Sequence, residues 1–397
     1  MTSEWHEVPL RELVGYISKG IAPSYAEEAS ETTIRVLNQK CNRNFRISYG
    51  DSRLHDTLKK KVPPERYVKP DDILINSTGA GTAGRIAQIE DVPSATTIDG
   101  HMILIRSNRK VTQKFLGYAL KAHQWEVLQL DEGSTGQTEL NRDRLLDEIM
   151  INYPVSFDEQ NAIVGTLESI DRKLIVNEQL NDNLLGQMQA LYRSWFVDFL
   201  PFGGSKPRTW TETDIYSLAN IIYGAPFKSK QFNTDGVGTP IIRIRDLKDQ
   251  QFATYTTEIH PKGYLLQPGD IVVGMDGEFR PYIWGNDGAW LNQRVCVFEN
   301  KRPNGKAFLY FTIKPLLYGI EQTQVATTVI HIGKKDFDAF EITLPDASTL
   351  DDFDALTTPM MRVIVSNCFE NKRLAALRDI LLPKLMSGEI DVSDIQL

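Results

Sequence analysis

The chain has 397 residues, of which 41% are hydrophobic, so it can bury more than one core, and its length favours two or three domains. Its three cysteines, Cys41, Cys296 and Cys368, are isolated and odd in number, which argues against a disulfide framework or a zinc site. No signal peptide and no apolar run of membrane-spanning length can be read, so we expect a cytoplasmic protein. The net charge of -8 is unusual for a nucleic-acid binder, which is expected to be basic.

Short elements fill the first part of the chain. Alternating apolar residues predict strands at 33–37 and 46–49, and the β-branched run after the turn residues Pro70 and Asp71 predicts a buried strand. Further elements are expected as a strand at 101–106, a helix within 114–128, a helix start near Asn141 and a strand at 148–153. This mixture predicts a globular block with both helices and strands.

Residues 156–199 predict one long helix. Apolar residues recur in alternating steps of four and three, as in a coiled coil, and Ser156 is the expected N-cap, with Glu159 completing a capping box. The residues at seven-residue steps along this seam are Ile163, Ile170, Asn177, Leu184 and Leu191. A polar residue such as Asn177 at a seam position lowers stability but fixes register and partner number.

The second half of the chain repeats the first. A second seam, with an asparagine again at its centre, lies 190 positions after the first and consists of Phe353, Met360, Asn367, Leu374 and Leu381. The turn-and-strand run at 267–273 likewise answers the run at 69–75. The repeat predicts two globular blocks and two long helices that lie side by side along one seam and hold the blocks apart.

The predicted boundaries follow from this repeat. They are a globular block at 1–155, a long helix at 156–199, a linker at 200–209, a second block at 210–346, a second long helix at 347–386 and a tail at 387–397. Pro383 is expected to end regular structure near the end of the second helix. Nearly all of the acidic excess falls on the two helices, which permits a local basic face on each block.

No motif predicts a chemical step. Gly79, Gly81 and Gly84 match the G-x-G-x-x-G pattern, but a strand-like run at 85–89 follows where a nucleotide site needs a helix, so a glycine-rich hairpin is favoured. The six histidines show no metal-ligand spacing. Phosphate-loop, nucleophile-elbow and base-gripping methyltransferase motifs are not found in the sequence. We therefore expect a protein that is not an enzyme and that has no metal or cofactor of its own.

Polar loops with interleaved basic and aromatic residues are the candidate binding surfaces, because Arg and Lys pair with phosphates or guanine edges, and Asn and Gln pair with adenine. In the first block the candidates are Tyr25, Asn38, Lys40, Arg43, Lys59, Lys60, Lys61, Ser134, Thr135, Gln137 and Arg142. In the second block they are Lys228, Lys230, Arg243, Arg245, Arg280, Tyr282, Gln322 and Gln324. For any single residue an ordinary solvated surface is the alternative, so the set carries more weight than its members.

The pattern resembles the specificity subunit of type I restriction-modification enzymes. The likeness rests on the two-block, two-helix repeat over essentially the whole chain, and on three runs at 157–160 (Phe-Asp-Glu-Gln), 191–199 and 377–390. The second helix departs from the pattern because its opening, 350–353, lacks the Glu-Gln pair, so a partner would dock there differently in detail.

The resemblance implies an α+β protein with a pseudo-twofold internal repeat, in which two mixed α/β target recognition domains are separated by two long helices that form an antiparallel coiled coil. Each domain would read one half of a split site in double-stranded DNA. The helices would set the spacer and dock two modification subunits, which bind S-adenosylmethionine and methylate adenine. Two restriction subunits, which are motor nucleases that use ATP and Mg²⁺, would complete the anti-phage complex, and the chain itself would be non-catalytic.

Two other classes of function stay open from the residues alone. A two-headed coiled-coil scaffold that binds proteins and no DNA would fit the acidic net charge. An enzyme would need a catalytic constellation, and none is recognisable in the sequence.

Overall fold

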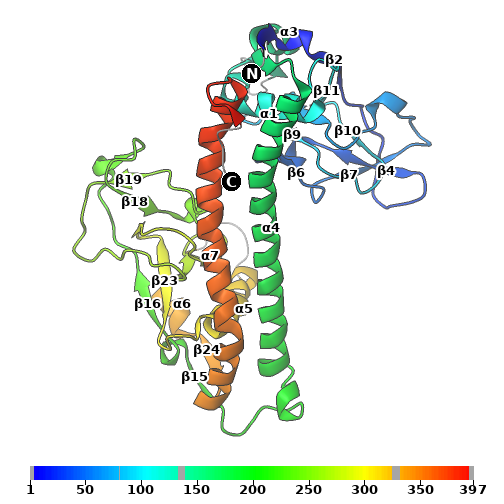
Figure 1. Cartoon of the computed structure of the whole chain (residues 1–397). Helices are drawn as coiled ribbons and strands as arrows, with labels where there is room; N and C mark the ends of the chain where they lie inside the picture. Colours follow the sequence, from blue (N-terminus) through cyan, green and yellow to red (C-terminus); the bar gives the residue numbers. More distant parts are fainter. Residues whose placement is uncertain (1–3, 80, 133–138, 324–330, 393–397) are drawn as a thin grey trace. The chain divides into compact units, whose positions relative to one another are not determined.

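A computed structural model gives the structure of the chain, and it describes residues 4–79, 81–132, 139–323 and 331–392. The chain forms two compact units: unit 1 comprises residues 1–172 and 375–397, and unit 2 comprises residues 173–374. Two helices of 40 residues, α4 (Phe157–Phe196) and α7 (Ala347–Met386), contribute to both units (Figure 1). Because α7 begins 190 residues after α4 and has the same length, the two helices repeat residue for residue.

The described residues of unit 1 form two four-stranded sheets and three strand pairs. The first sheet has the order β2 (Val14–Lys19), β11 (Met102–Ser107), β8 (Ile73–Asn76) and β9 (Ile86–Gln88). The second has the order β10 (Thr96–Ile98), β4 (Thr33–Leu37), β7 (Arg53–Asp56) and β3 (Tyr25–Ala26). The pairs are β1 (Trp5–Pro9) with β14 (Met150–Pro154), β5 (Asn42–Arg43) with β6 (Arg46–Ile47), and β12 (Asp131–Glu132) with β13 (Glu139–Leu140). Its shorter helices are α1 (Gln113–Ala122), α2 (Gln124–Val127) and α3 (Arg142–Glu148).

In the part of unit 2 that the structure describes there are two four-stranded sheets and one strand pair. The first sheet has the order β16 (Ala219–Tyr223), β23 (Val295–Asn300), β20 (Ile271–Gly274) and β21 (Pro281–Ile283). The second has the order β22 (Trp290–Leu291), β18 (Thr239–Ile242), β19 (Tyr255–Thr256) and β17 (Phe232–Asn233). The pair is β15 (Thr211–Asp214) with β24 (Glu341–Leu344), and the shorter helices are α5 (Lys306–Thr323) and α6 (Lys334–Asp338).

The internal repeat is confirmed strand by strand. The sheet β2-β11-β8-β9 is antiparallel throughout and corresponds in order to β16-β23-β20-β21. The second sheets correspond as well, including the one parallel pairing in each, β10 with β4 and β22 with β18. The central strands β8 and β20 owe their place to aliphatic residues that are buried on both faces.

The glycine-rich run after β8 is a hairpin, as predicted. β8 and β9 pair antiparallel, and Gly79, Gly81 and Gly84 between them have positive φ, which glycine adopts without steric cost. Ala80 lies outside the described residues. Because β9 occupies the place where a dinucleotide site would need a helix, this turn lacks the geometry that holds a pyrophosphate.

The prediction that Pro383 ends regular structure is wrong, because α7 continues to Met386. Proline lacks the N–H donor and its ring crowds the preceding turn, so this last turn is unfavourable in isolation. Leu382, Leu385 and Met386 are buried in unit 1, and this packing outweighs the local cost. Gly388, at φ 73°, then ends the helix against the ring of Trp5.

Asparagines pair the two long helices in unit 2. The side-chain amide of Asn177 on α4 donates to Asn371 Oδ1 on α7 at 2.8 Å, and that of Asn367 donates to Asn181 Oδ1 at 2.8 Å. The residue numbers rise along one helix as they fall along the other, so the helices run antiparallel here. The two contacts are equivalent, because a shift of 190 residues converts Asn177 into Asn367 and Asn181 into Asn371.

The ten predicted seam residues lie inward on the two helices. Less than a tenth of the residue is exposed for Ile163, Ile170, Asn177, Phe353, Asn367 and Leu381. The half-buried members are Leu184, Leu191, Met360 and Leu374. Among the described residues no helix is long and apolar enough to cross a lipid bilayer.

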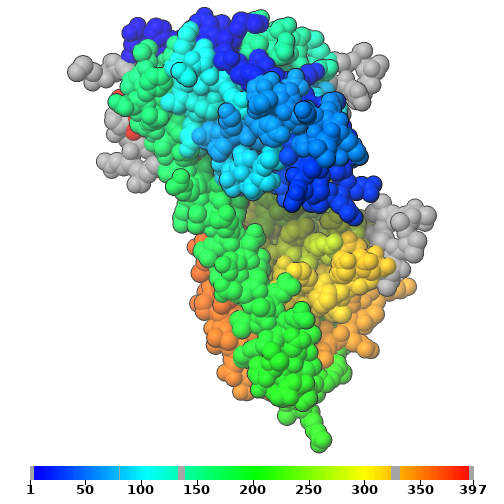
Figure 2. All heavy atoms as spheres, turned by 90° about the vertical axis from the view of Figure 1, so that its right-hand side faces the viewer, coloured from blue at the N-terminus to red at the C-terminus, as the bar shows by residue number. Residues whose placement is uncertain are grey.

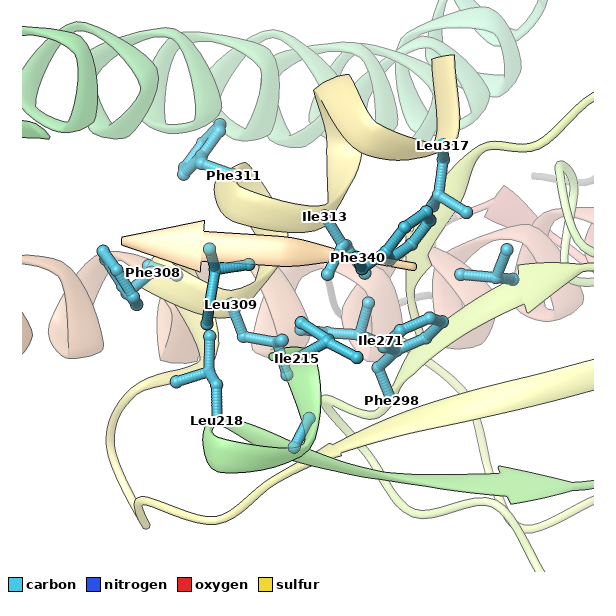
Figure 3. Close-up of a cluster of buried hydrophobic side chains, with 14 of the residues drawn as sticks. Ile215, Leu218, Ile271, Phe298, Phe308, Leu309, Phe311, Ile313, Leu317 and Phe340 are labelled. Carbon is cyan, nitrogen blue, oxygen red and sulfur yellow. The ribbon is translucent and has the colours of Figure 1, made fainter. Parts of the chain in front are cut away.

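Aromatic residues attach α4 to the globular part of unit 2. The ring of Phe196 lies 4.8 Å from that of Phe308 on α5 and 4.9 Å from that of Phe353 on α7, both edge-on. Trp195 packs edge-on against Phe353 at 5.8 Å. Figure 3 shows how Phe308 and its neighbours on α5 continue this packing into the core over the sheet. These contacts make Trp195 and Phe196 an aromatic anchor between α4 and the globular part of unit 2.

In unit 1 a buried network of charged groups, instead of aromatic rings, connects α4 to the rest of the unit. The Asp171 carboxylate on α4 accepts hydrogen bonds from Tyr118 Oη (2.9 Å) and Lys121 Nζ (2.9 Å) on α1, and from Arg378 Nη1 (3.0 Å) on α7. The side chains of Lys121, Asp171 and Arg378 are only 10%, 17% and 18% exposed. Burial opposes ionisation of Asp171, but the two cations outweigh it and hold the pKa of this carboxyl below its usual value.

Candidate functional site

The polar loops that follow β4 and β18 are built alike. Asn38 is the N-cap of a short 3-10 helix, where its Oδ1 accepts from the N–H of Lys40 at 2.8 Å. Arg243 holds the same position after β18, and its guanidinium bonds Asp246 within a second short 3-10 helix. Because the Asn38 side chain caps the backbone and the Arg243 guanidinium is held by the Asp246 carboxylate, both are structural residues first. Their exposed neighbours, Lys40 and Arg245, remain the candidates for ligand contact.

Three other predicted residues of unit 1 lie on strands and helices. Tyr25 on β3 is 39% exposed, and the guanidinium carbon of Arg53 stacks 3.4 Å from its ring centre. Arg43 is exposed in the hairpin of β5 and β6, and Arg142 is exposed at the first position of α3. The sequence analysis missed Arg53, which is exposed on β7.

The predicted lysine run, 59–61, forms a well-defined loop after β7. Lys60 Nζ donates to the carbonyl of Ala22 at 2.8 Å, and the buried His55 ring bonds both the N–H of Ser24 (2.9 Å) and the carbonyl of Lys60 (2.8 Å). These bonds bring the lysine loop beside the segment that leads into Tyr25. Two predicted clusters of unit 1 therefore form one surface.

The corresponding segments of unit 2 also meet. The backbone N–H of Lys228 donates to the Glu258 carboxylate at 2.7 Å, and the ring of Phe227 lies 5.5 Å from that of His260. Lys228 and Lys230 are exposed here, beside the loop that follows β19. In unit 1 the segment before β3 thus contacts the loop after β7, and in unit 2 the segment before β17 contacts the loop after β19.

Of the remaining candidates, two are held in other contacts, one is exposed and four lie outside the described residues. The Arg280 guanidinium forms a two-pronged ion pair with Glu321, which raises the arginine pKa, and it stacks over Tyr318 at 5.7 Å. Tyr282 is half-buried against the core, and burial raises the pKa of its hydroxyl. Gln322 is exposed in the last described turn of α5. The predicted residues Ser134, Thr135, Gln137 and Gln324 lie outside the described residues.

Within the described ranges no three His, Cys, Asp or Glu side chains gather as a metal site would require. The arrangement that the two units share is one of exposed basic and aromatic side chains on loops, held by a rigid sheet. Such a surface suits binding to an anionic polymer better than it suits a reaction.

The chain resembles known proteins over nearly all of its length. A family model described as the type I restriction modification DNA specificity domain matches residues 2–185 and 207–362. The specificity subunit of the type I restriction enzyme EcoBI from Escherichia coli is 37% identical over 138 residues, which are 34% of this chain and 29% of that subunit. The MjaIX specificity subunit of Methanocaldococcus jannaschii is 24% identical over 88% of this chain and 84% of its own length.

A solved structure shares the fold. The S subunit of a type I restriction-modification system from M. genitalium superposes with a TM-score of 0.56 at 16% identity, covering 97% of this chain and 96% of that one. The fold of this chain is thus that of the S subunit of known structure. The family match covers both halves, and the chain belongs to the type I restriction-modification DNA specificity family.

Proposed function

We propose that the chain is the non-catalytic subunit that gives a type I restriction-modification complex its DNA sequence specificity. The globular part of each unit would read one half of a split duplex site. One observation carries this proposal. The two units have the same strand order but different loops, which is what two readers of different sequences on one scaffold require. The relatives named as specificity subunits support it.

The long helices would set the spacing between the two half-sites. Two modules that bind the same face of DNA need a separation of about one helical turn, roughly 34–36 Å, and a helix pair can fix such a distance where a flexible linker cannot. The paired asparagines support this role, because they allow one register of α4 against α7 within unit 2.

The outer faces of the helices would dock two modification subunits, which supply S-adenosylmethionine and the methyl transfer, and two restriction subunits would add ATP- and Mg²⁺-dependent cleavage. Figure 2 shows the outer side of the C-terminal half of α4 (green) at the molecular surface. Exposed aliphatic side chains lie on both helices: Val176, Leu180, Leu356, Val363, Leu377 and Ile380. Apolar residues on an outer helix face support docking of a partner.

Methylome sequencing tests the proposal. A host that carries this chain with its modification subunit should contain N6-methyladenine at one split motif, and deletion of the chain should remove that methylation. The motif would supply both half-sites. An unchanged methylome from a complex shown to assemble would contradict the proposal.

Insertion of seven residues into both α4 and α7 tests the spacing role. The helices would lengthen by about 10 Å, so the tolerated spacer should grow by about three base pairs while both half-sites stay the same. Insertion into one helix alone is the control, because it breaks the pairing and should abolish methylation. An unchanged spacer in the doubly extended chain would contradict the proposal that the helices set the spacing between the half-sites.

The alternative, a scaffold that binds proteins and no DNA, draws support from the acidic net charge of -8. Salt separates the two functions. A DNA reader that contacts several phosphates should lose roughly a thousandfold in affinity between 50 and 200 mM salt, whereas a scaffold should show no DNA binding to lose.

A further inference from the structure

Each unit exposes one large aliphatic side chain to an extreme degree. Leu58 is 79% exposed and Ile259 is 83% exposed, and these are the two most exposed large hydrophobic residues in the part of the chain that the structure describes. Single exposed aliphatics are ordinary on protein surfaces. These two require an explanation because they occupy the same place in the repeat.

The strand register establishes the equivalence. Leu54 on β7 and Tyr255 on β19 each pair with the residue two positions before the end of the neighbouring strand, β4 or β18 (β7 and β19 are labelled in Figure 1). Leu58 follows Leu54 by four residues, and Ile259 follows Tyr255 by four residues. The surrounding sequences differ, yet both loops place a bare aliphatic side chain at this position.

The loop of unit 1 is rigid where Leu58 projects. Asp56 Oδ1 accepts from the N–H of Leu58 at 2.9 Å, and the N–H of Thr57 donates to the carbonyl of Thr32 at 3.0 Å. The backbone is therefore fixed at Thr57 and Leu58, and the exposure of Leu58 is a consequence of that geometry. A side chain held outward by a rigid backbone loses little entropy when a ligand covers it.

The loop of unit 2 is held by different contacts to the same effect. Thr256 Oγ1 accepts from the N–H of Glu258 at 3.1 Å, and the Glu258 carboxylate accepts from the N–H of Lys228. His260, on the other side of Ile259, accepts from the N–H of Lys262 at 3.1 Å and packs on an aromatic ring. The same presentation built from other residues indicates that the aliphatic tip is functional.

The charge around the tips identifies their ligand. Lys61 follows Leu58 by three residues and Lys262 follows Ile259 by three residues, and both lysines are exposed. Lys59 adds a further exposed ammonium beside Leu58. An aliphatic tip with exposed lysines nearby matches a groove of DNA, where phosphates line the rims and thymine methyl groups offer apolar contacts on the floor.

We propose that Leu58 and Ile259 are groove-inserting contacts, one for each half-site, and that Lys61 and Lys262 neutralise the adjacent phosphates. The proposal rests on the proposed DNA-reading function and adds residues to it. Each aliphatic tip touches base edges in its own half-site, so it contributes to the choice of bases. Each lysine contributes affinity without sequence preference.

Binding of the full chain, assembled with its modification subunits, to duplexes carrying the methylome-derived half-sites tests the proposal. Leu58→Ala should weaken binding about tenfold and should reduce discrimination against changes in one half-site only. Ile259→Ala should act in the same way on the other half-site. Leu58→Met, which keeps an apolar tip, should retain most of the affinity. Lys61→Gln should instead lower the slope of log affinity against log salt by about one while leaving base discrimination intact.

Leu200→Ala is the matched control, because Leu200 is 65% exposed in the linker and belongs to neither loop, so its loss should leave DNA binding unchanged. If the wild-type complex binds no split site, the proposed function fails. If it binds but Leu58→Ala and Ile259→Ala bind equally well, only the groove contact fails. Loss of the modification subunits in either variant, with DNA binding intact, would assign the tips to a protein partner and also overturn the proposal.

Discussion

The two units hold the same pair of helices with opposite chemistry. In unit 1 Asp171 and Arg378 form a buried ion pair between α4 and α7. The residues 190 positions away in unit 2, Met361 and Met188, are both buried in an apolar core. The same topology therefore forms with either an ion pair or apolar side chains at these equivalent positions. The hydrophobic pattern of the remaining residues is enough to specify that topology.

The helices that cover the sheets differ in the same way. α5 begins 193 residues after α1, so Phe311 replaces the Tyr118 hydroxyl that bonds the carboxylate, and Lys314 corresponds to Lys121. Lys314 is exposed at the edge of an apolar pocket of about 370 Å³, whereas Lys121 is buried. Without a carboxylate to pair with, the unit 2 lysine remains in water. The buried ionic network of unit 1 thus requires all of its charged residues to be present together.

That dependence gives the largest expected effect. Asp171→Asn should destabilise unit 1 by about 3–5 kcal/mol, because Lys121 and Arg378 lose their shared carboxylate while staying buried. Hydrogen exchange of the α1 amides should speed up while that of the α5 amides stays unchanged. Replacing Asp171 and Arg378 by methionine, as in unit 2, together with Lys121→Met so that no unpaired charge stays buried, should restore most of the protection. Equal loss in both units would show that the network does not act locally.

The aromatic attachment of unit 2 should give the next largest effect. Trp195→Ala removes a half-buried ring from beside Phe353, so unit 2 should lose about 2–3 kcal/mol, seen as faster exchange along α5. Trp195→Leu copies Leu385, the residue at the equivalent position of α7, and should lose less than half as much. Unaltered exchange and unaltered assembly in the alanine variant would rule out the anchor.

The two long helices could be predicted from the sequence. Seven-residue steps from Ile163 and from Phe353 give their lengths and the repeat, because seam periodicity is a local signal. The network around Asp171 could not be foreseen, since it joins α1, α4 and α7 from residues more than 200 positions apart.

The candidate site divides in the same way. Exposed lysines such as Lys61 could be read from composition. Asn38 and Arg243 look like ligand residues in sequence, and only the structure shows that Asn38 caps a short helix and that Arg243 is bonded to Asp246. The tips Leu58 and Ile259 escape a search for polar residues altogether. Exposure of an aliphatic side chain is a tertiary property that no local pattern contains.

The neutral asparagine pairs of unit 2 should give a smaller effect of opposite sign. Asn181→Leu with Asn367→Leu replaces one buried amide pair by an apolar contact, so the helix pair should gain about 1 kcal/mol in stability. The gain should come with looser register, seen as methylation of sites whose spacer differs from the native length. If the protein became more stable and its choice of spacer length stayed the same, these asparagines would not be needed to fix the helix register.

The smallest effect is a pH dependence confined to unit 1. The pKa of Asp171 is lower in the folded state than in the unfolded state, so the ionised carboxylate stabilises folding above the unfolded value, near pH 4. This contribution is lost as the pH falls through the folded pKa, with a slope of at most about 1.4 kcal/mol per pH unit for one proton. Exchange of the α1 amides should therefore accelerate below about pH 4 more than that of the α5 amides. The triple methionine variant should remove the difference, because unit 1 would then hold its helices as unit 2 does, and a difference that persisted would have to arise from another carboxylate of unit 1.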